Sequence, residues 1–142
     1  MLFLYMTDTH TKEQRSYNMS RIKGKDTKPE IIVRRWLWNN GYRYRIHRKD
    51  LPGKPDIVFP GRKKIIFING CFWHKHDCKS FKWPTSNTEY WSRKIERNTE
   101  RDAENCSRLI SGGWDFIIIW ECELKKKDLT SVWKRITKFL SE

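Results

Sequence analysis

The sequence predicts a single α/β domain with a mixed central sheet flanked by helices. Two short runs, residues 64–68 and 114–120, are almost wholly apolar, which is typical of strands that are buried on both faces. A long stretch with helical character, residues 87–112, separates the two runs. The 142 residues suffice for one domain with a substantial core, and they show no internal repeat or interdomain linker.

The first half of the chain predicts one helix followed by a three-stranded meander. The helix should begin after Asp26-Thr27, which can cap it, carry Pro29 in its first turn and end at Gly41. Alternation of aromatic and basic residues from Tyr42 to His47 predicts a strand with a basic outer face. The predicted elements are a helix at 28–40 and strands at 42–47, 56–59 and 64–68, with turns at 51–55 and 60–62.

The second half predicts a helix, a strand and a final helix. The long helix should begin near Asn87 and end at Gly112-Gly113, and most of its charged residues should form a solvated face. The apolar strand 114–120 follows, and residues 128–140 should close the chain as a helix. Cys106, within the long helix, is interpreted as an ordinary buried thiol.

The charge balance indicates an anionic partner. The chain has 30 Lys and Arg against 17 Asp and Glu, a net charge of +13, and 14% of its residues are aromatic. Basic charge with interleaved rings suits nucleic acid, where phosphates bind the cations and bases contact the rings. A membrane surface is the weaker alternative, because no amphipathic basic helix stands alone.

Residues 1–26 predict a basic N-terminal arm, and residues 27–142 predict the folded domain. The arm is polar and lacks periodicity, so a partner would have to order it. Its apolar start, residues 1–6, is too short for a signal peptide or a membrane span. Four cysteines with metal-like spacing and no signal peptide indicate a reducing cytoplasm.

Residues 69–78 carry a predicted zinc site. The spacing Cys-x2-His-x-His-x-Cys supplies Cys71, Cys78 and one of two histidines, His74 or His76. Thiolate and imidazole are the ligands that zinc prefers in a tetrahedral shell. The loop cannot easily supply a fourth ligand, so we expect it from Cys122, just beyond the strand at 114–120. The alternative is a surface turn without metal.

Asp56 is a candidate ligand for a second metal, although in isolation a solvated aspartate at the end of a turn would be the stronger interpretation. Asp56 begins a short strand in a basic protein, where a carboxylate can hold Mg²⁺ against a phosphodiester. The histidine that zinc does not use could then carry a proton. For Glu30, in the first turn of the first helix, a favourable interaction with the helix dipole is the stronger interpretation from the sequence alone.

Four sequence blocks resemble the very-short-patch repair (Vsr) endonuclease family. They are Pro52-Gly53-Lys54-Pro55-Asp56, Gly70-Cys71-Phe72-Trp73-His74, Arg101-Asp102 and Trp120-Glu121-Cys122. The resemblance runs from about Thr11 to about Leu140, and its cysteine-containing block is highly specific. It implies a PD-(D/E)xK-like nuclease fold with a structural zinc, and Mg²⁺-dependent nicking of double-stranded DNA 5′ to the thymine of a T:G mismatch. It further implies a monomer in the bacterial cytoplasm, associated with the nucleoid and with other repair proteins.

The same resemblance implies roles for individual residues. Asp56 would bind Mg²⁺ with the backbone carbonyl of Ile68, and His74 would be the catalytic histidine. Around the magnesium-bound waters would lie Glu30, Asn98 and Asp102. The zinc ligands would be Cys71, His76, Cys78 and Cys122, which selects His76 over His74. Residues inserting into DNA would be Met19, Phe72 and Trp73.

The chain departs from the family at Ile68-Asn69, where a threonine and a histidine are frequent. A backbone carbonyl can come from Ile68, but Asn69 cannot carry a proton, so more of the proton transfer falls on His74. The acid-x-Lys half of the nuclease motif is absent, as in the family.

Phe72 and Trp73 lie between a predicted zinc ligand and the predicted catalytic histidine. A tight loop cannot easily turn two rings and two ligands inward at once, so we expect the rings to be presented to DNA. Burial of both rings in the core is the alternative, and for Phe72 the two are nearly balanced.

Two other functions agree with the sequence. One is a restriction-type nuclease without mismatch specificity, which a panel of matched and T:G duplexes would identify. The other is a zinc-stabilised DNA-binding module without activity, which a plasmid-nicking assay with and without Mg²⁺ would identify.

Overall fold

A computed structural model describes residues 26–79 and 81–142, and the predicted arm, including Met19, lies outside this part of the chain except for Asp26. The elements are α2 (Lys28–Asn39), β1 (Arg45–Ile46), β2 (Ile57–Phe59), the 3₁₀ helix η2 (Pro60–Arg62), β3 (Lys64–Asn69), α3 (Thr88–Ser111), β4 (Asp115–Trp120), α4 (Glu121–Leu124) and α5 (Thr130–Ser141). The predicted mixed α/β architecture is confirmed. No helix in the described part is long and apolar enough to cross a membrane.

The sheet has the strand order β1-β2-β3-β4. The first three strands pair antiparallel as a meander, while β3 and β4 pair in parallel over six residue pairs, from Lys64 with Asp115 to Asn69 with Trp120. A parallel pair needs a crossover connection, and α3 supplies it. In consequence β3 and β4 end at the same edge of the sheet.

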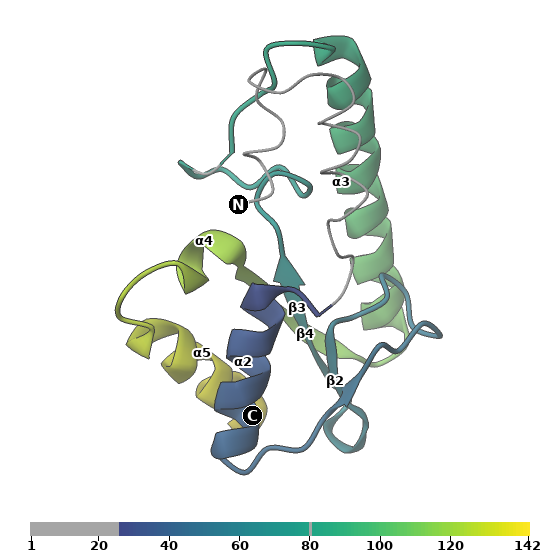
Figure 1. The fold of residues 1–142 in the computed structure, drawn as a ribbon. Helices are drawn as coiled ribbons and strands as arrows, with labels where there is room; N and C mark the ends of the chain where they lie inside the picture. Colours follow the sequence, from purple (N-terminus) through teal and green to yellow (C-terminus); the bar gives the residue numbers. More distant parts are fainter. Residues whose placement is uncertain (1–25, 80) are drawn as a thin grey trace.

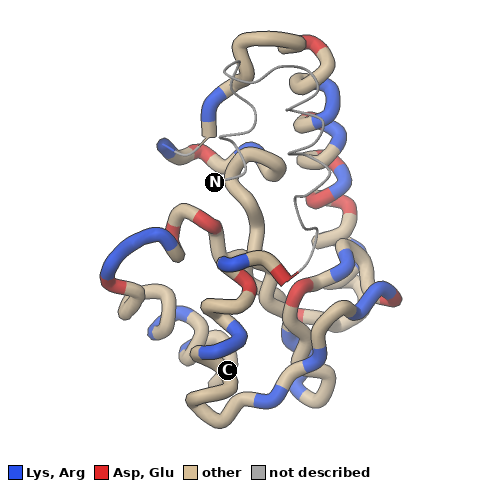
Figure 2. The backbone as a smooth tube through the Cα atoms, viewed as in Figure 1, with Lys and Arg blue, Asp and Glu red and all other residues tan. Residues whose placement is uncertain are grey.

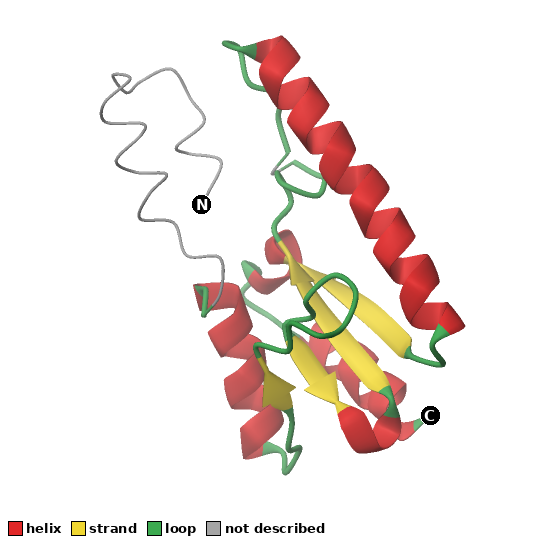
Figure 3. Cartoon of the chain, turned by 90° about the vertical axis from the view of Figure 1, so that its right-hand side faces the viewer, coloured by secondary structure: helices red, strands yellow, loops and turns green. Residues whose placement is uncertain are grey.

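Alternate side chains of the strands pack on opposite faces of the sheet. On one face, Ile57, Phe59 and Ile66 pack with residues of α2 and α5, while on the other, Val58, Ile65 and Phe67 pack with Leu109 of α3. Figure 3 shows α2 and α3 on opposite sides of the sheet. The sheet is therefore the middle layer of a three-layer domain.

Helix α3 extends well beyond the sheet (Figure 1). Its 24 residues correspond to a length of about 36 Å. Only its C-terminal part, at Leu109, packs on the strands, while Trp91 and Ile95 in its N-terminal half form a separate cluster with Phe72. The helix thus supports both the sheet and the loop that follows β3.

Two elements differ from the prediction. Strand β1 contains two residues rather than six, and His47 just after it has a left-handed φ of 57°, which ends the extended backbone. Helix α4 was not predicted, because four residues are too few to show a helical period. It is stabilised at its start by Glu123, whose Oε2 accepts a hydrogen bond of 2.8 Å from the backbone N–H of Trp120.

Candidate metal centre and active site

The parallel pairing of β3 and β4 places two loops of different sequence origin side by side. Asn69 pairs with Trp120, so the segment that begins at Gly70 and the segment that begins at Glu121 leave the sheet together. Figure 1 shows these segments between α4 and the N-terminal half of α3. Most of the predicted site residues come from this edge.

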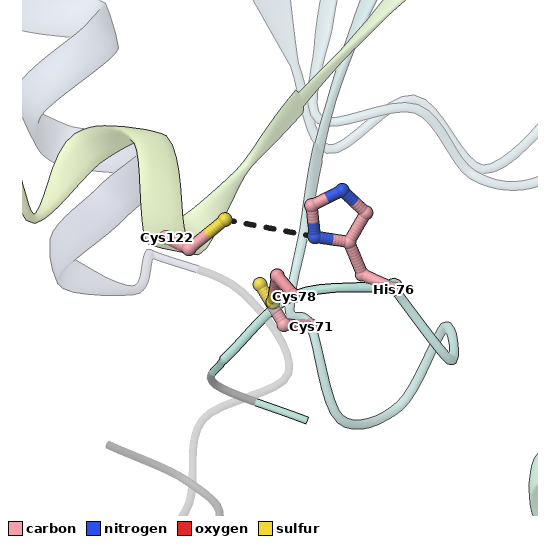
Figure 4. A group of neighbouring side chains, drawn as sticks. All are labelled: Cys71, His76, Cys78 and Cys122. Atoms are coloured by element: carbon pink, nitrogen blue, oxygen red, sulfur yellow. Dashed lines mark hydrogen bonds between the residues drawn. The ribbon is translucent and has the colours of Figure 1, made fainter. Parts of the chain in front are cut away.

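A cluster of three thiols and one imidazole lies in these loops (Figure 4). The ligand atoms of Cys71, His76, Cys78 and Cys122 all lie within 4.8 Å of one another. In a tetrahedral shell with metal–sulfur bonds near 2.3 Å, neighbouring ligand atoms would be about 3.7 Å apart, so small movements suffice to bind one ion. The four predicted zinc ligands therefore form a group that could hold a metal.

Local backbone and ring contacts orient the histidine of this cluster. The backbone N–H of His76 donates to the carbonyl of Cys71 at 2.9 Å, in a turn where Lys75 has a left-handed φ of 51°. The ring of His76 stacks on Trp120, with centroids 4.0 Å apart and planes 10° apart, and its Nδ1 lies 3.5 Å from Sγ of Cys122. His74, by contrast, lies outside the cluster.

Burial makes two thiols of the cluster weaker acids than a free cysteine. Burial raises the pKa of Cys71 to about 12 and also raises the pKa of Cys122. A divalent cation at the centre of the cluster would oppose this shift, because it favours the thiolate form. The donor set fits a metal with four protein ligands, which leaves no open position for a substrate.

His74 is held from the long helix. Its Nδ1 lies in hydrogen-bond contact with Oδ2 of Asp102, and both side chains are partly exposed. One helical turn earlier, Nδ2 of Asn98 donates to the carbonyl of Trp73 at 3.2 Å. Helix α3 thus fixes the backbone and the ring on either side of the Trp73-His74 bond, and Nε2 is the imidazole nitrogen that remains for a substrate.

Asp56 lies at the start of β2, half-buried, and its Oδ2 accepts a hydrogen bond of 2.7 Å from the backbone N–H of Ile68. The pKa of Asp56 is raised to about 7. Burial is the main cause and the charge of Glu30 adds to it, while this hydrogen bond and the electrostatic influence of His74 and Arg34 act in the opposite direction. Asp56 thus interacts electrostatically with α2 and with His74 of the loop at residues 70–79, here called the metal loop. A cation at this carboxylate would favour its charged form.

Glu30 is buried at the start of α2, with 4% of its surface exposed. It accepts hydrogen bonds from the backbone N–H of Asp26 at 3.0 Å and from the Thr27 hydroxyl at 3.2 Å, as a helix-capping acid does. Arg34 donates to it at 2.8 Å and also contacts Asp26 at 2.9 Å. These contacts hold Glu30 at the start of α2, from where its charge acts on Asp56.

Phe72 is buried, with 1% of its surface exposed, contrary to the expectation that both rings face outward. It packs edge-on against Trp73 and Trp91, with centroids 5.2 and 5.7 Å away, and against Ile95. The ring of Phe72 and the thiol of Cys71 can both be buried because Trp91 and Ile95 of α3 pack against Phe72. Trp73 is half-buried.

Sequence reasoning missed three contributors to this region. Arg34, the stacking of Trp120 on His76, and the role of Trp91 in packing the loop were not predicted. Trp120 had a usable signal, because it precedes a predicted zinc ligand, and Arg34 had another in its i,i+4 spacing from Glu30. Trp91 lies in a helix whose faces could not be assigned to the site before the topology was known.

The sequence matches known proteins over most of its length. The model of a family described as DNA mismatch endonuclease Vsr matches residues 7–80. A type II nicking enzyme, V.XorIIP of Xanthomonas oryzae pv. oryzae, is 46% identical over 135 residues, covering 95% of this chain and 98% of the relative. Another, V.NmeAIP of Neisseria meningitidis, is 48% identical over 122 residues, covering 86% and 87%. The DNA mismatch endonuclease Vsr of Escherichia coli is 42% identical over 123 residues, covering 87% and 79%.

Replacing Cys122 should remove a bound metal and much of the stability. In Cys122→Ala the cluster would lose the ligand that joins α4 to the loop, and binding energy at such closed sites is largely folding energy. We expect metal analysis to find no bound ion in Cys122→Ala and thermal unfolding to occur at a clearly lower temperature. Cys106 lies outside the cluster, so the control variant Cys106→Ala should retain both the metal and the wild-type unfolding temperature. A metal-free wild type that melts as the variant does would contradict the assignment.

Replacing Arg34 should destabilise the start of α2. Arg34→Ala would leave the buried carboxylate of Glu30 and that of Asp26 without their shared cation, at a cost of roughly 2–3 kcal/mol in the free energy of unfolding. Chemical denaturation measures the change. The exposed neighbour Arg35, replaced in Arg35→Ala, is the matched control and should be nearly neutral. Equal stabilities of the two variants would show that the network contributes nothing.

Proposed function

The chain belongs to the Vsr family of DNA mismatch endonucleases, and on that premise we propose that it nicks one strand of duplex DNA 5′ to the thymine of a T:G mismatch. The chain is a DNA endonuclease. The observation that carries the finer proposal is the meeting of Asp56, His74 and an aromatic loop at one sheet edge, within a protein of net charge +13.

We assign Mg²⁺ to the carboxylate of Asp56 and the backbone carbonyl of Ile68, and zinc to the four-residue cluster. Bound there, Mg²⁺ would neutralise charge on the scissile phosphate and lower the pKa of a bound water. The hydrogen bond from the backbone N–H of Ile68 holds Asp56 in place. Glu30, Asn98 and Asp102 are proposed to orient the surrounding waters, and their contacts with Arg34, Trp73 and His74 fix their positions.

His74 is proposed to move the proton in this reaction. Asp102 holds its Nδ1, so Nε2 is the atom that would exchange a proton with water or with the oxygen of the broken phosphodiester bond. Asn69, at the end of β3, offers only an amide. One histidine would therefore carry the proton transfer that two could share.

We propose that the chain acts as a monomer. We further propose that residues 1–26 form the basic arm, from which Met19 would approach DNA. Trp73 is the aromatic residue of the loop best placed to contact DNA directly, while insertion of Phe72 would require its cluster with Trp91 to open. Location with the bacterial nucleoid and contact with other repair proteins belong to the same proposal.

The second candidate is strand nicking without mismatch specificity. Two relatives are named as type II nicking enzymes, with no mention of a mismatch, which agrees with this candidate as well as with the first. A panel of otherwise identical matched and T:G duplexes separates the two candidates. The third possibility, a DNA-binding module without activity, disagrees with membership of an endonuclease family.

Replacing Asp56 should abolish nicking without abolishing DNA binding. Asp56→Ala would remove a magnesium ligand, and loss of several kcal/mol of charge stabilisation lowers the rate by roughly a thousandfold or more. Affinity for T:G duplex should persist or rise slightly, since a negative charge near phosphate is lost. Asp115→Ala, an exposed carboxylate at the opposite end of the parallel strands, should nick normally. Near-normal nicking by Asp56→Ala would place the magnesium elsewhere.

Replacing Trp73 should test the aromatic contact with the mismatch. Insertion of a ring costs a few kcal/mol of unstacking, and this cost is lower where pairing is already weakened. We expect Trp73→Ala to lose most of its preference for T:G over matched duplex in competition binding, while its metal content and salt-dependent binding of matched DNA persist. Unfolding of the variant would identify the ring as core, and undiminished discrimination would refute the contact.

A further inference from the structure

Two exposed ring–lysine pairs, Lys75 with Trp83 and Lys94 with Tyr90, flank the aromatic cluster around Phe72 and are here together called the aromatic–lysine surface. The side chain of Trp83 is 45% exposed and that of Tyr90 is 52% exposed. Each ring has a lysine near it: Nζ of Lys75 lies 5.6 Å from the centroid of Trp83, and Nζ of Lys94 lies 5.8 Å from that of Tyr90. These distances are within the range of cation–π attraction.

Ring contacts connect this surface to the buried aromatic cluster around Phe72. Trp83 packs edge-on against Phe81 at 5.2 Å, and Phe81 stacks on Phe72 at 6.0 Å. On the helix, Tyr90 packs against Trp91 at 5.1 Å. The two exposed rings are therefore the outer ends of one series of ring contacts that begins in the metal loop.

The aromatic–lysine surface is unusual within the described part of the chain. Across the described residues, four large apolar side chains are strongly exposed: Trp38, Trp83, Tyr90 and Ile110. Two of the four belong to this surface, next to the proposed active site. Both rings are joined to the same buried aromatic cluster rather than scattered singly, and exposed apolar groups that belong to one cluster mark interaction sites more often than isolated ones do.

The chemistry of the surface favours nucleotides. Rings that stack on bases, combined with cations that bind phosphates, are typical of sites for single-stranded nucleic acid. Figure 2 shows basic and acidic segments interspersed along α3 and basic segments in the loop that leads to it, so the cations proposed to bind phosphate are the individual lysines beside the rings. The acidic neighbour Glu89 is ion-paired with Arg93 at 3.9 Å, so it does not reverse the local charge.

We propose that the aromatic–lysine surface binds unstacked nucleotides of a DNA strand, with Trp83 and Tyr90 against bases and Lys75 and Lys94 against phosphates. The inference rests on the proposed function in one respect, that DNA is the ligand. The role of the aromatic–lysine surface would be to hold the DNA strand next to the mismatch once the bases there have lost their stacking. Binding at this surface requires neither a mismatch nor Mg²⁺.

The test uses a labelled single-stranded oligothymidine of about twelve nucleotides, within the site sizes common for such surfaces. Fluorescence anisotropy without Mg²⁺ gives its dissociation constant. We expect the double variant Trp83→Ala, Tyr90→Ala to bind at least roughly tenfold more weakly, since each ring stacks on a base. Trp38→Ala, an equally exposed tryptophan on α2, is the control and should bind normally. A double variant within about twofold of wild type would overturn the inference.

Salt dependence tests the lysines without altering any ring. Lys94→Gln should reduce the slope of log affinity against log salt by about 0.7, the value for one phosphate of a single strand. Lys63→Gln is the matched control, because Lys63 also lies over a tryptophan, 5.4 Å from the centroid of Trp114, but at the opposite end of β3. Equal slopes for the two variants would overturn the assignment of Lys94.

These results separate the inference from the proposed function. If wild type nicks T:G duplex but fails to bind the oligonucleotide, the inference is wrong and the proposed function stands. If wild type binds the oligonucleotide through Trp83 and Tyr90 but does not prefer T:G duplex, the surface is correctly assigned and the mismatch specificity is wrong. Thermal unfolding and metal content, unchanged in each variant, establish that the fold is intact.

Discussion

The parallel pairing of β3 with β4 is the constraint on which the rest of the structure depends. Six residue pairs align the C-terminal ends of the two strands, so Asn69 lies beside Trp120 although the two residues are far apart in the sequence. Everything assembled at that edge comes from segments that start there. A shift of register by two residues would move Cys122 by more than 6 Å relative to the loop and separate the cluster.

The crossover that this pairing demands also builds the second half of the site. Helix α3 buries Leu109 against the sheet, while Ile95 in its N-terminal half packs against Phe72 and Asp102 near its middle contacts His74. A helix shorter than α3 could connect β3 to β4. The additional helical turns of α3 position the loop and its histidine from a rigid element rather than from another loop.

The sequence was most informative where chemistry or burial leaves a local pattern. Apolar runs predicted β3 and β4, and glycines and a proline bounded α2 and α3. The spacing of cysteines and histidines singled out the three cysteines of the cluster, and the family resemblance selected His76 over His74. The sequence was least informative where the outcome depends on packing between distant segments. The burial of Phe72 depends on Trp91 and Ile95, which belong to α3. The sequence around Phe72 carries no signature of this contact. The ion pair between Glu30 and Arg34, by contrast, has the helical i,i+4 spacing and could have been read from the sequence.

The connectivity of the cysteine–histidine cluster has a consequence for the unfolded chain. Three of its residues lie within eight positions, but Cys122 lies about 50 residues from Cys71, and all of α3 and β4 falls between them. An ion held by all four closes this segment into a ring, as a disulfide would, without requiring oxidation. For a ring of about 50 residues, loop-closure entropy corresponds to about 4 kcal/mol. The cluster would then act as a reversible covalent-like cross-link, whose strength depends on the supply of the ion rather than on the redox state of its surroundings.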